Sequence, residues 1–169
     1  MVIQAKRYHD ISVGHRVHGH EGKCANLHGH NYRIFFTVEA EKLDSVGRVI
    51  DFSVIKEQLC AWLENNWDHK FLAWENDPLM CAIAYVDVAS HLRRASTSPG
   101  YSKLDTQLAE ELEATLELSI VFTPFNPTAE NMAEYLITAV GPYVLIGLGV
   151  KLVEVTIEET RKCSVTCKN

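Results

Sequence analysis

Cys24-Ala25-Asn26-Leu27-His28-Gly29-His30 runs directly into Asn31-Tyr32-Arg33-Ile34-Phe35-Phe36-Thr37-Val38-Glu39-Ala40. The second half of this stretch alternates in polarity and is rich in aromatic and β-branched residues, which predicts a β-strand ending near Glu41. If the strand also includes His28 and His30, their imidazoles share one face, because side chains alternate along a strand. The stretch therefore predicts a strand that carries two potential metal ligands.

A third imidazole is available upstream. His15 lies near the end of a strand predicted over residues 2–17. An antiparallel hairpin of the two strands would place His15 beside His28 and His30, which completes the three-histidine set of a catalytic zinc site. The pair His18-Gly19-His20 is a competing set in a glycine-containing loop. On residue chemistry alone, hydrogen-bonded surface histidines are the alternative interpretation.

Cys24 lies in the polar segment Gly22-Lys23-Cys24-Ala25-Asn26, so burial in a core is not expected. Lys23 and a nearby metal would both favour the thiolate form of Cys24. Structural zinc sites fill four positions with protein ligands, whereas catalytic sites keep one open. Three histidines with a separate thiol close by therefore indicate a catalytic centre, in which Cys24 acts as base or nucleophile.

Two acidic positions are further candidates. Asp68 directly precedes His69, and an acid beside a histidine can hold a proton relay; a helix-terminal cap is the alternative. Glu159 ends a strand predicted over residues 150–160. Its carboxylate can accept two N–H donors from a heterocycle, and an exposed edge charge is the alternative. Cys163 and Cys167 form a lone pair of thiols, which indicates a zinc ribbon only weakly.

The remaining pattern predicts one α+β domain, with helices packed on one face of an antiparallel β-sheet. Asp51 is the expected N-cap of a helix that begins at Phe52, and Cys60 on that helix is assigned to packing. Thr128 is the expected N-cap of a helix that stops at Gly141-Pro142. The other predicted elements are a helical or irregular segment at 78–91, an exposed amphipathic helix over Lys103 to Leu118 and a short strand over Ser119 to Phe122.

Composition narrows the class of protein. The chain has 169 residues, a net charge of −6 and an isoelectric point near 5.7, which argues against a nucleic-acid binder but not against an anionic small molecule. Five irregularly spaced cysteines predict reduced thiols rather than a disulfide framework. No leader-like or membrane-length apolar run is visible. We therefore expect a cytoplasmic protein.

Taken together, six blocks resemble the 6-pyruvoyl-tetrahydropterin synthase family, and within it the branch that makes 6-carboxy-tetrahydropterin for queuosine and deazapurine biosynthesis. They occur in the family's order and cover both ends of the chain. The blocks are Ser12-Val-Gly-His15-Arg16, Lys23-Cys24-Ala-Asn-Leu-His28-Gly-His30-Asn-Tyr32, Gly47-Arg-Val-Ile-Asp51-Phe52, Trp67-Asp68-His69-Lys-Phe-Leu72, Pro127-Thr128-Ala-Glu130-Asn131 and Ile157-Glu-Glu159-Thr160. The Cys-x₃-His-Gly-His spacing is similar to that of the carboxy branch.

The resemblance implies a role for each candidate residue. It implies zinc on His15, His28 and His30, Cys24 as the proton-abstracting thiolate, and Asp68 with His69 as a proton relay. It also implies that Glu159 anchors the pterin and joins the relay, with Thr128 nearby. The implied reaction converts 7,8-dihydroneopterin triphosphate to 6-carboxy-5,6,7,8-tetrahydropterin, acetaldehyde and triphosphate. The implied assembly is a homo-oligomer of tunnelling-fold type, a barrel of joined sheets with active sites at the subunit junctions.

Two departures from the family pattern and three alternatives stand beside this hypothesis. Ala73 replaces a common asparagine, and the segment at about 75–125 is a long insertion that can shield the site, extend an interface or do neither. The alternatives are a pyruvoyl-forming, triphosphate-eliminating lyase, a zinc hydrolase that does not need Cys24, and a non-catalytic zinc-stabilised interaction module. Candidates for holding the triphosphate are Lys23, Arg16 and Arg161.

Overall fold

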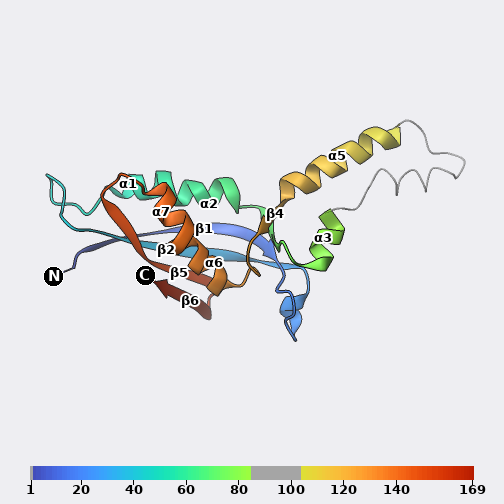
Figure 1. The fold of residues 1–169 in the computed structure, drawn as a ribbon, viewed down its shortest axis with the longest axis horizontal. Coiled ribbons are helices and arrows are strands. Elements are labelled where there is room, and N and C mark those ends of the chain that lie inside the picture. The colour runs from blue at the N-terminus through green and yellow to red at the C-terminus, as the bar shows by residue number, and fades with distance from the viewer. Residues whose placement is uncertain (1, 85–103) are drawn as a thin grey trace, which may run out of the picture.

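The computed structural model describes residues 2–84 and 104–169 (Figure 1). Within them lies a six-stranded sheet in the order β4-β3-β1-β2-β5-β6. The strands are β1 (Gln4–His15), β2 (His28–Ala40), β3 (Lys70–Trp74), β4 (Ile120–Thr123), β5 (Val150–Thr160) and β6 (Cys163–Lys168). The helical elements are η1 (Lys23–Ala25), α1 (Phe52–Ile55), η2 (Lys56–Cys60), α2 (Ala61–Asn66), α3 (Pro78–Ala84), α5 (Leu104–Ser119), α6 (Ala129–Tyr135), η3 (Leu136–Val140) and α7 (Gly141–Val144).

The predicted hairpin is present. Strands β1 and β2 pair antiparallel over their whole length, from Gln4 opposite Glu39 to His15 opposite His28. Alternate residues of β2 face the core, and Tyr32, Ile34 and Phe36 are fully buried. The loop that joins the two strands lies at the end of the sheet away from both termini (Figure 1). The hairpin thus carries the histidine-rich segment to one end of the molecule.

The prediction of a purely antiparallel sheet is wrong for two of the five strand pairs. Strand β3 runs parallel to β1, and β4 runs parallel to β3. Parallel neighbours need long crossover connections, and here the segment that contains α3 and α5 joins β3 to β4. Strand β3 was not predicted from the sequence, because Lys70-Phe-Leu-Ala-Trp74 is short and its side chains do not alternate in polarity. The edge strand β6 was not predicted either. The sheet is mixed.

Two long helical segments cover one face of the sheet. The first joins α1, η2 and α2, and Asp51 caps it by accepting the Ser53 N–H, as predicted. Cys60 is fully buried in the core, as its assignment to packing requires. The second segment joins α6, η3 and α7 and packs against β5. Burial of these apolar faces between helices and sheet supplies most of the core.

The second helical segment does not stop at Gly141-Pro142 but continues to Val144. Pro142 is the second residue of α7 and lies inside the continuous helical segment, where a proline removes one helix hydrogen bond. The π-helical turn η3 immediately precedes it. A Cβ on Gly141 would lie 2.7 Å from Leu152 Cδ2, so glycine permits the close approach of this helix to β5. Tertiary packing therefore overrides the helix-stop signal.

The segment predicted as an insertion begins with α3 and ends with α5 and β4. Helix α5 matches the predicted amphipathic helix closely and extends away from the sheet (Figure 1). The second half of the prediction for 78–91 and the first residue of the prediction for 103–118 lie outside the described residues. Among the described residues, no helix is long and apolar enough to cross a membrane.

Candidate metal centre and active site

The structure brings His15, His28 and His30 together on the helix-covered face, at the end of the hairpin. His15 ends β1 directly opposite His28, and Val13 pairs with His30. One potential ligand atom from each histidine lies within 4.8 Å of the others. A Cβ on the intervening Gly29 would lie 2.9 Å from the Val13 carbonyl oxygen, so the His-Gly-His pattern also permits close pairing of the strands. Among the described residues, this is the group of side chains with metal-ligand geometry.

Backbone carbonyl groups orient two of these rings. The Nδ1 atom of His15 lies 2.7 Å from the Pro127 oxygen, and the Nδ1 atom of His28 lies 2.8 Å from the Asn26 oxygen. A carbonyl oxygen only accepts hydrogen bonds, so each Nδ1 carries the proton and each neutral ring keeps its Nε2 lone pair. Such outer contacts are typical of histidines that bind metals. The ring orientation therefore fits a divalent cation.

Burial supports the same state of His15. Its side chain is 1% exposed. This burial lowers the pKa of His15 below its usual value, against the opposing effect of the Pro127 carbonyl group. A neutral imidazole is the form that binds a metal. The most buried ligand is thus held ready for a cation at neutral pH.

Glu159 and Tyr32 complete this cluster. Glu159 Oε1 lies 3.9 Å from His15 Nε2 and 3.7 Å from His30 Nε2. The Tyr32 hydroxyl lies 3.2 Å from Glu159 Oε1 and 3.1 Å from His15 Nε2. One hydroxyl proton cannot serve both acceptors at once, so the cluster has more acceptors than donors. Burial raises the pKa of Tyr32, and the Glu159 charge raises it further, which keeps the phenol protonated.

Cys24 lies in the single turn η1 and is a half-buried free thiol. Its carbonyl oxygen accepts the Val17 N–H at 2.8 Å, so the turn folds back on the end of β1. Since Val17 lies two residues after His15, this hydrogen bond brings the Cys24 backbone near the histidine that ends β1. Cys24 is not part of the ligand group formed by the three histidines. The structure thus places the backbone of Cys24 beside the end of β1, and the thiol lies outside the ligand group.

Asp68 and His69 form a contact of their own between α2 and β3. Asp68 Oδ2 lies 2.9 Å from His69 Nδ1, and Asp68 Oδ1 accepts the Ser12 N–H at 2.8 Å. Partial burial opposes ionisation, yet the hydrogen bonds from Ser12 and His69 lower the pKa of Asp68. His69 has a φ of 56°, in the left-handed region, and its side chain is 80% exposed. The pair projects a solvent-accessible imidazole from a fixed carboxylate.

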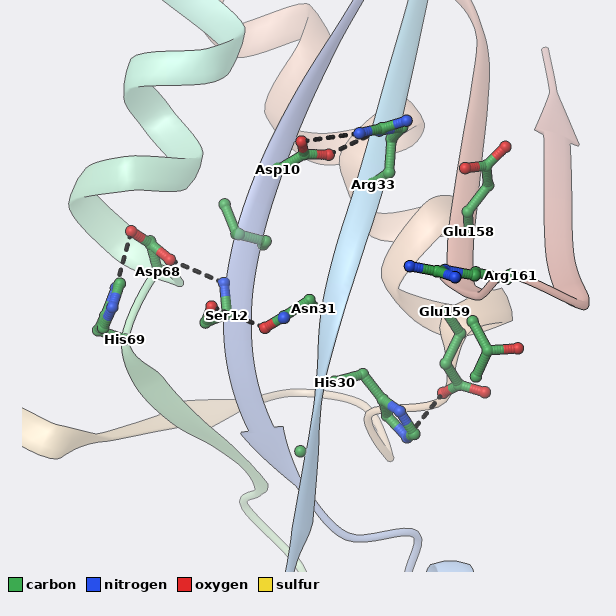
Figure 2. Close-up of a pocket in the computed structure, with 13 residues that line it drawn as sticks. Asp10, Ser12, His30, Asn31, Arg33, Asp68, His69, Glu158, Glu159 and Arg161 are labelled. Carbon is green, nitrogen blue, oxygen red and sulfur yellow. Dashed lines mark hydrogen bonds and ion pairs between the residues drawn. The ribbon is translucent and has the colours of Figure 1, made fainter.

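The histidine cluster and the Asp68–His69 pair are apart within one chain. Figure 2 shows Asp68 and His69 on one side of β1 and β2, with His30 and Glu159 on the other. All four residues line one open hollow of about 750 Å³, which extends over the uncovered face of the sheet. Among the described residues, no hydrogen bond or ion pair joins the two groups. One chain thus presents two separate groups of candidate residues.

Other predicted candidates take simpler places. Thr128 caps α6 by accepting the Asn131 N–H at 3.3 Å, as predicted, so its hydroxyl oxygen already has a structural role. His20 Nδ1 accepts the Gly22 N–H and does not join the metal cluster. Arg16 forms an ion pair with Asp77, so its charge is already matched. Of the three candidates for the triphosphate, Arg161 lines the hollow.

Sequence reasoning did not assign a role to Tyr32 or Pro127. Tyr32 follows His28 and His30 at the same two-residue interval, so strand alternation could have placed it on the same face. The carbonyl group of Pro127 lies 112 positions from His15. No local sequence pattern predicts such a contact, because the backbone carbonyl group of almost any distant residue could accept the His15 proton.

Comparisons with known proteins show the family of the chain. The family model described as 6-pyruvoyl tetrahydropterin synthase matches residues 4–169. Proteins named 6-carboxy-5,6,7,8-tetrahydropterin synthase from Rickettsia felis and Rickettsia typhi are 27% and 29% identical over 164 residues, which is 97% of this chain and 99% of each relative.

Two solved structures share the fold. An uncharacterized protein from Wolinella succinogenes is 24% identical with a TM-score of 0.74, over 100% of this chain and 99% of that chain. The 6-pyruvoyl tetrahydropterin synthase of Caenorhabditis elegans is 22% identical with a TM-score of 0.60, over 100% of this chain and 96% of that chain. With the family match over almost its whole length, the chain belongs to the 6-pyruvoyl tetrahydropterin synthase family and is a lyase of the tetrahydropterin synthase type.

Proposed function

We propose that the chain, with zinc on His15, His28 and His30, converts 7,8-dihydroneopterin triphosphate and water to 6-carboxy-5,6,7,8-tetrahydropterin, acetaldehyde and triphosphate. The observation that carries this proposal is the cluster of three histidines with neighbouring Glu159, beside which the Cys24 turn is hydrogen-bonded to the residue that follows Arg16. The names of the two Rickettsia relatives and the Cys-x₃-His-Gly-His spacing favour the carboxy product over the pyruvoyl product.

Each side chain has a defined task in this proposal. Glu159 accepts N–H donors of the pterin ring, and the hydroxyl group of Tyr32 fixes the orientation of that carboxylate. The Cys24 thiolate removes a proton from the substrate side chain next to the ring. When bound, zinc supplies acidification of substrate hydroxyls and stabilisation of negative charge. His69, held by Asp68, returns protons at another face.

The reaction can be tested with a single incubation. Zinc-loaded protein is mixed with 7,8-dihydroneopterin triphosphate, and mass spectrometry identifies the pterin and any aldehyde. Release of acetaldehyde with 6-carboxy-tetrahydropterin supports the proposal. A product that retains all side-chain carbons identifies the pyruvoyl-forming lyase instead, and loss of phosphate alone identifies a hydrolase. No turnover, together with unfolding on chelation, identifies a zinc-stabilised interaction module.

Glu159→Gln is expected to raise the KM for the pterin substrate by about 10- to 100-fold while zinc content is unchanged. A charge-assisted hydrogen bond is worth roughly 1.5–3 kcal/mol, and the amide replaces one acceptor oxygen with a donor. Steady-state kinetics and metal analysis measure the two effects. Glu154→Gln is the matched control, because Glu154 lies on the same strand but pairs with Lys6 and Lys168. An unchanged KM for Glu159→Gln would remove the pterin-anchoring assignment.

The separation of the histidine cluster from the Asp68–His69 pair supports a homo-oligomer in which this pair serves the histidine cluster of a neighbouring chain. We expect Cys24→Ala and His69→Ala to be inactive alone and to regain activity when unfolded together and refolded as a mixture. With equal amounts of the two variants, random assembly gives about a quarter of all junctions both intact halves. An active monomer in sedimentation, or no recovery on mixing although each variant assembles, would contradict the shared site.

A further inference from the structure

Arg16 and Asp77 form a largely buried ion pair beside the candidate site. Arg16 directly follows His15, and Asp77 directly precedes α3, at the start of the segment 75–125. Arg16 Nη1 lies 2.9 Å from Asp77 Oδ1, and the two side chains are 12% and 1% exposed. A charge as buried as that of Asp77 needs a partner. Arg16 is the closer of two basic side chains at this carboxylate, since His18 Nδ1 lies 3.7 Å from the same oxygen.

The other end of the guanidinium group reaches the turn that holds Cys24. Arg16 Nε donates to the Ala25 carbonyl oxygen at 2.9 Å. The backbone N–H of Val17 donates to the Cys24 carbonyl oxygen at 2.8 Å. These two hydrogen bonds tie the turn to the end of β1. The two donors belong to the adjacent residues Arg16 and Val17. A fixed Arg16 guanidinium group therefore also restrains the backbone N–H of Val17.

Asp77 also has an ordinary structural task. Its Oδ1 accepts the Leu79 N–H at 3.0 Å, which caps the short helix α3. A serine serves equally well at such a position, so capping alone does not require a carboxylate. The second oxygen, Oδ2, is buried and has no hydrogen-bond partner among the described residues. The carboxylate therefore carries a desolvation cost that capping does not explain but the bond to Arg16 does.

Asn126, which directly follows the segment 75–125, contacts the same loop. Asn126 Oδ1 accepts the His18 N–H at 3.0 Å, and Asn126 Nδ2 donates to the His18 carbonyl oxygen at 2.8 Å. The start of the segment and the residue that follows its end thus both contact residues that follow His15. The segment 75–125 is therefore held, at its start and just after its end, to the loop that carries Cys24.

We propose that Asp77 is a positioning residue, which holds the Cys24 turn through Arg16 and so couples the start of the segment 75–125 to the thiol. This role rests on the proposed function of Cys24 as base. The clamp, which is the chain of contacts from Asp77 through Arg16 to Ala25, does not depend on that function. Asp77 touches neither substrate nor thiol in this role. It acts only by fixing the guanidinium group that donates to Ala25.

Asp77→Ser separates the clamp from the cap, because serine keeps an acceptor for the Leu79 N–H but offers no charge to Arg16. Peptide-level hydrogen exchange on the zinc-loaded protein is the first readout. We expect exchange in residues 16–26 to accelerate about tenfold or more, since a charge-assisted hydrogen bond is lost, while residues 78–84 stay within about twofold. We also expect kcat to fall about tenfold or more with little change in KM or zinc content.

Three further variants complete the test. Arg16→Gln removes both the bond to Asp77 and the bond to Ala25. It is expected to accelerate exchange over residues 16–26 at least as much as Asp77→Ser, and the double variant to be no worse than Arg16→Gln alone, because the two positions act through one chain of contacts. Asp77→Asn keeps an acceptor for Arg16 and is expected to be intermediate; it also serves if Asp77→Ser does not fold. Asp44→Asn, which removes the exposed pair with Arg48, is the control and is expected to change neither readout.

The clamp is wrong if folded Asp77→Ser or Asp77→Asn shows wild-type exchange over residues 16–26, or if only residues 78–84 change. The exchange readout does not depend on turnover. If the wild-type protein shows no turnover of 7,8-dihydroneopterin triphosphate, the proposed function fails while the clamp is still decided by exchange. If exchange responds as expected but kcat does not, the positioning role for catalysis is overturned.

Discussion

Cys24→Ala is expected to abolish measurable turnover while the protein keeps one zinc ion per chain. A positioned general base contributes roughly 10²- to 10⁴-fold to a rate. Alanine has no ionisable side-chain atom that could replace the thiol. The cluster of ligand atoms consists of three histidines and does not include Cys24, so metal content should not change. Product formation by mass spectrometry and zinc content by elemental analysis measure the two effects.

The matched control for Cys24 is another cysteine. Cys163→Ala changes an exposed free thiol on β6 and is expected to leave turnover and zinc content as in the wild type. Normal turnover by Cys24→Ala would remove the base assignment and favour a zinc hydrolase. Loss of zinc from Cys24→Ala would instead make the thiol a ligand, which would turn the open catalytic site into a closed structural one.

His28→Ala is expected to lose zinc and, with it, turnover. Even outer contacts of metal ligands change affinity by about 10- to 100-fold, so removal of a ligand should weaken zinc binding by at least that factor. His28 is well suited to this test because its ring is only partly buried and its Nδ1 contacts only the nearby Asn26 carbonyl group. The fold should therefore survive, which circular dichroism would show while a chelator competition measures the zinc affinity.

His20→Ala is the control for His28→Ala, since His20 belongs to the competing pair His18-Gly19-His20. Its ring accepts the Gly22 N–H and lies outside the cluster. We expect His20→Ala to bind zinc as tightly as the wild type. Tight binding by His28→Ala with loss of zinc from His20→Ala would assign the metal to the competing pair and overturn the site.

The sequence predicts the centre of this molecule well because that part depends on local periodicity. Alternation defines β2 and β5, and antiparallel pairing then places His15 opposite His28. Asp51 and Thr128 cap their helices as expected, because N-capping is decided within a few residues. The resemblance to the tetrahydropterin synthase family, confirmed over residues 4–169, rests on motifs in these same elements.

Tertiary structure alone decides how the distant parts meet. The parallel strand β3 is defined by its neighbours rather than by its own pattern, and Pro142 continues a helix because packing on β5 outweighs a stop signal. The contacts from Pro127 to His15 and from Asp77 to Arg16 join residues 112 and 61 positions apart. Periodicity reports which face of an element is buried, whereas such contacts depend on which oxygen the completed fold brings within reach of a buried donor.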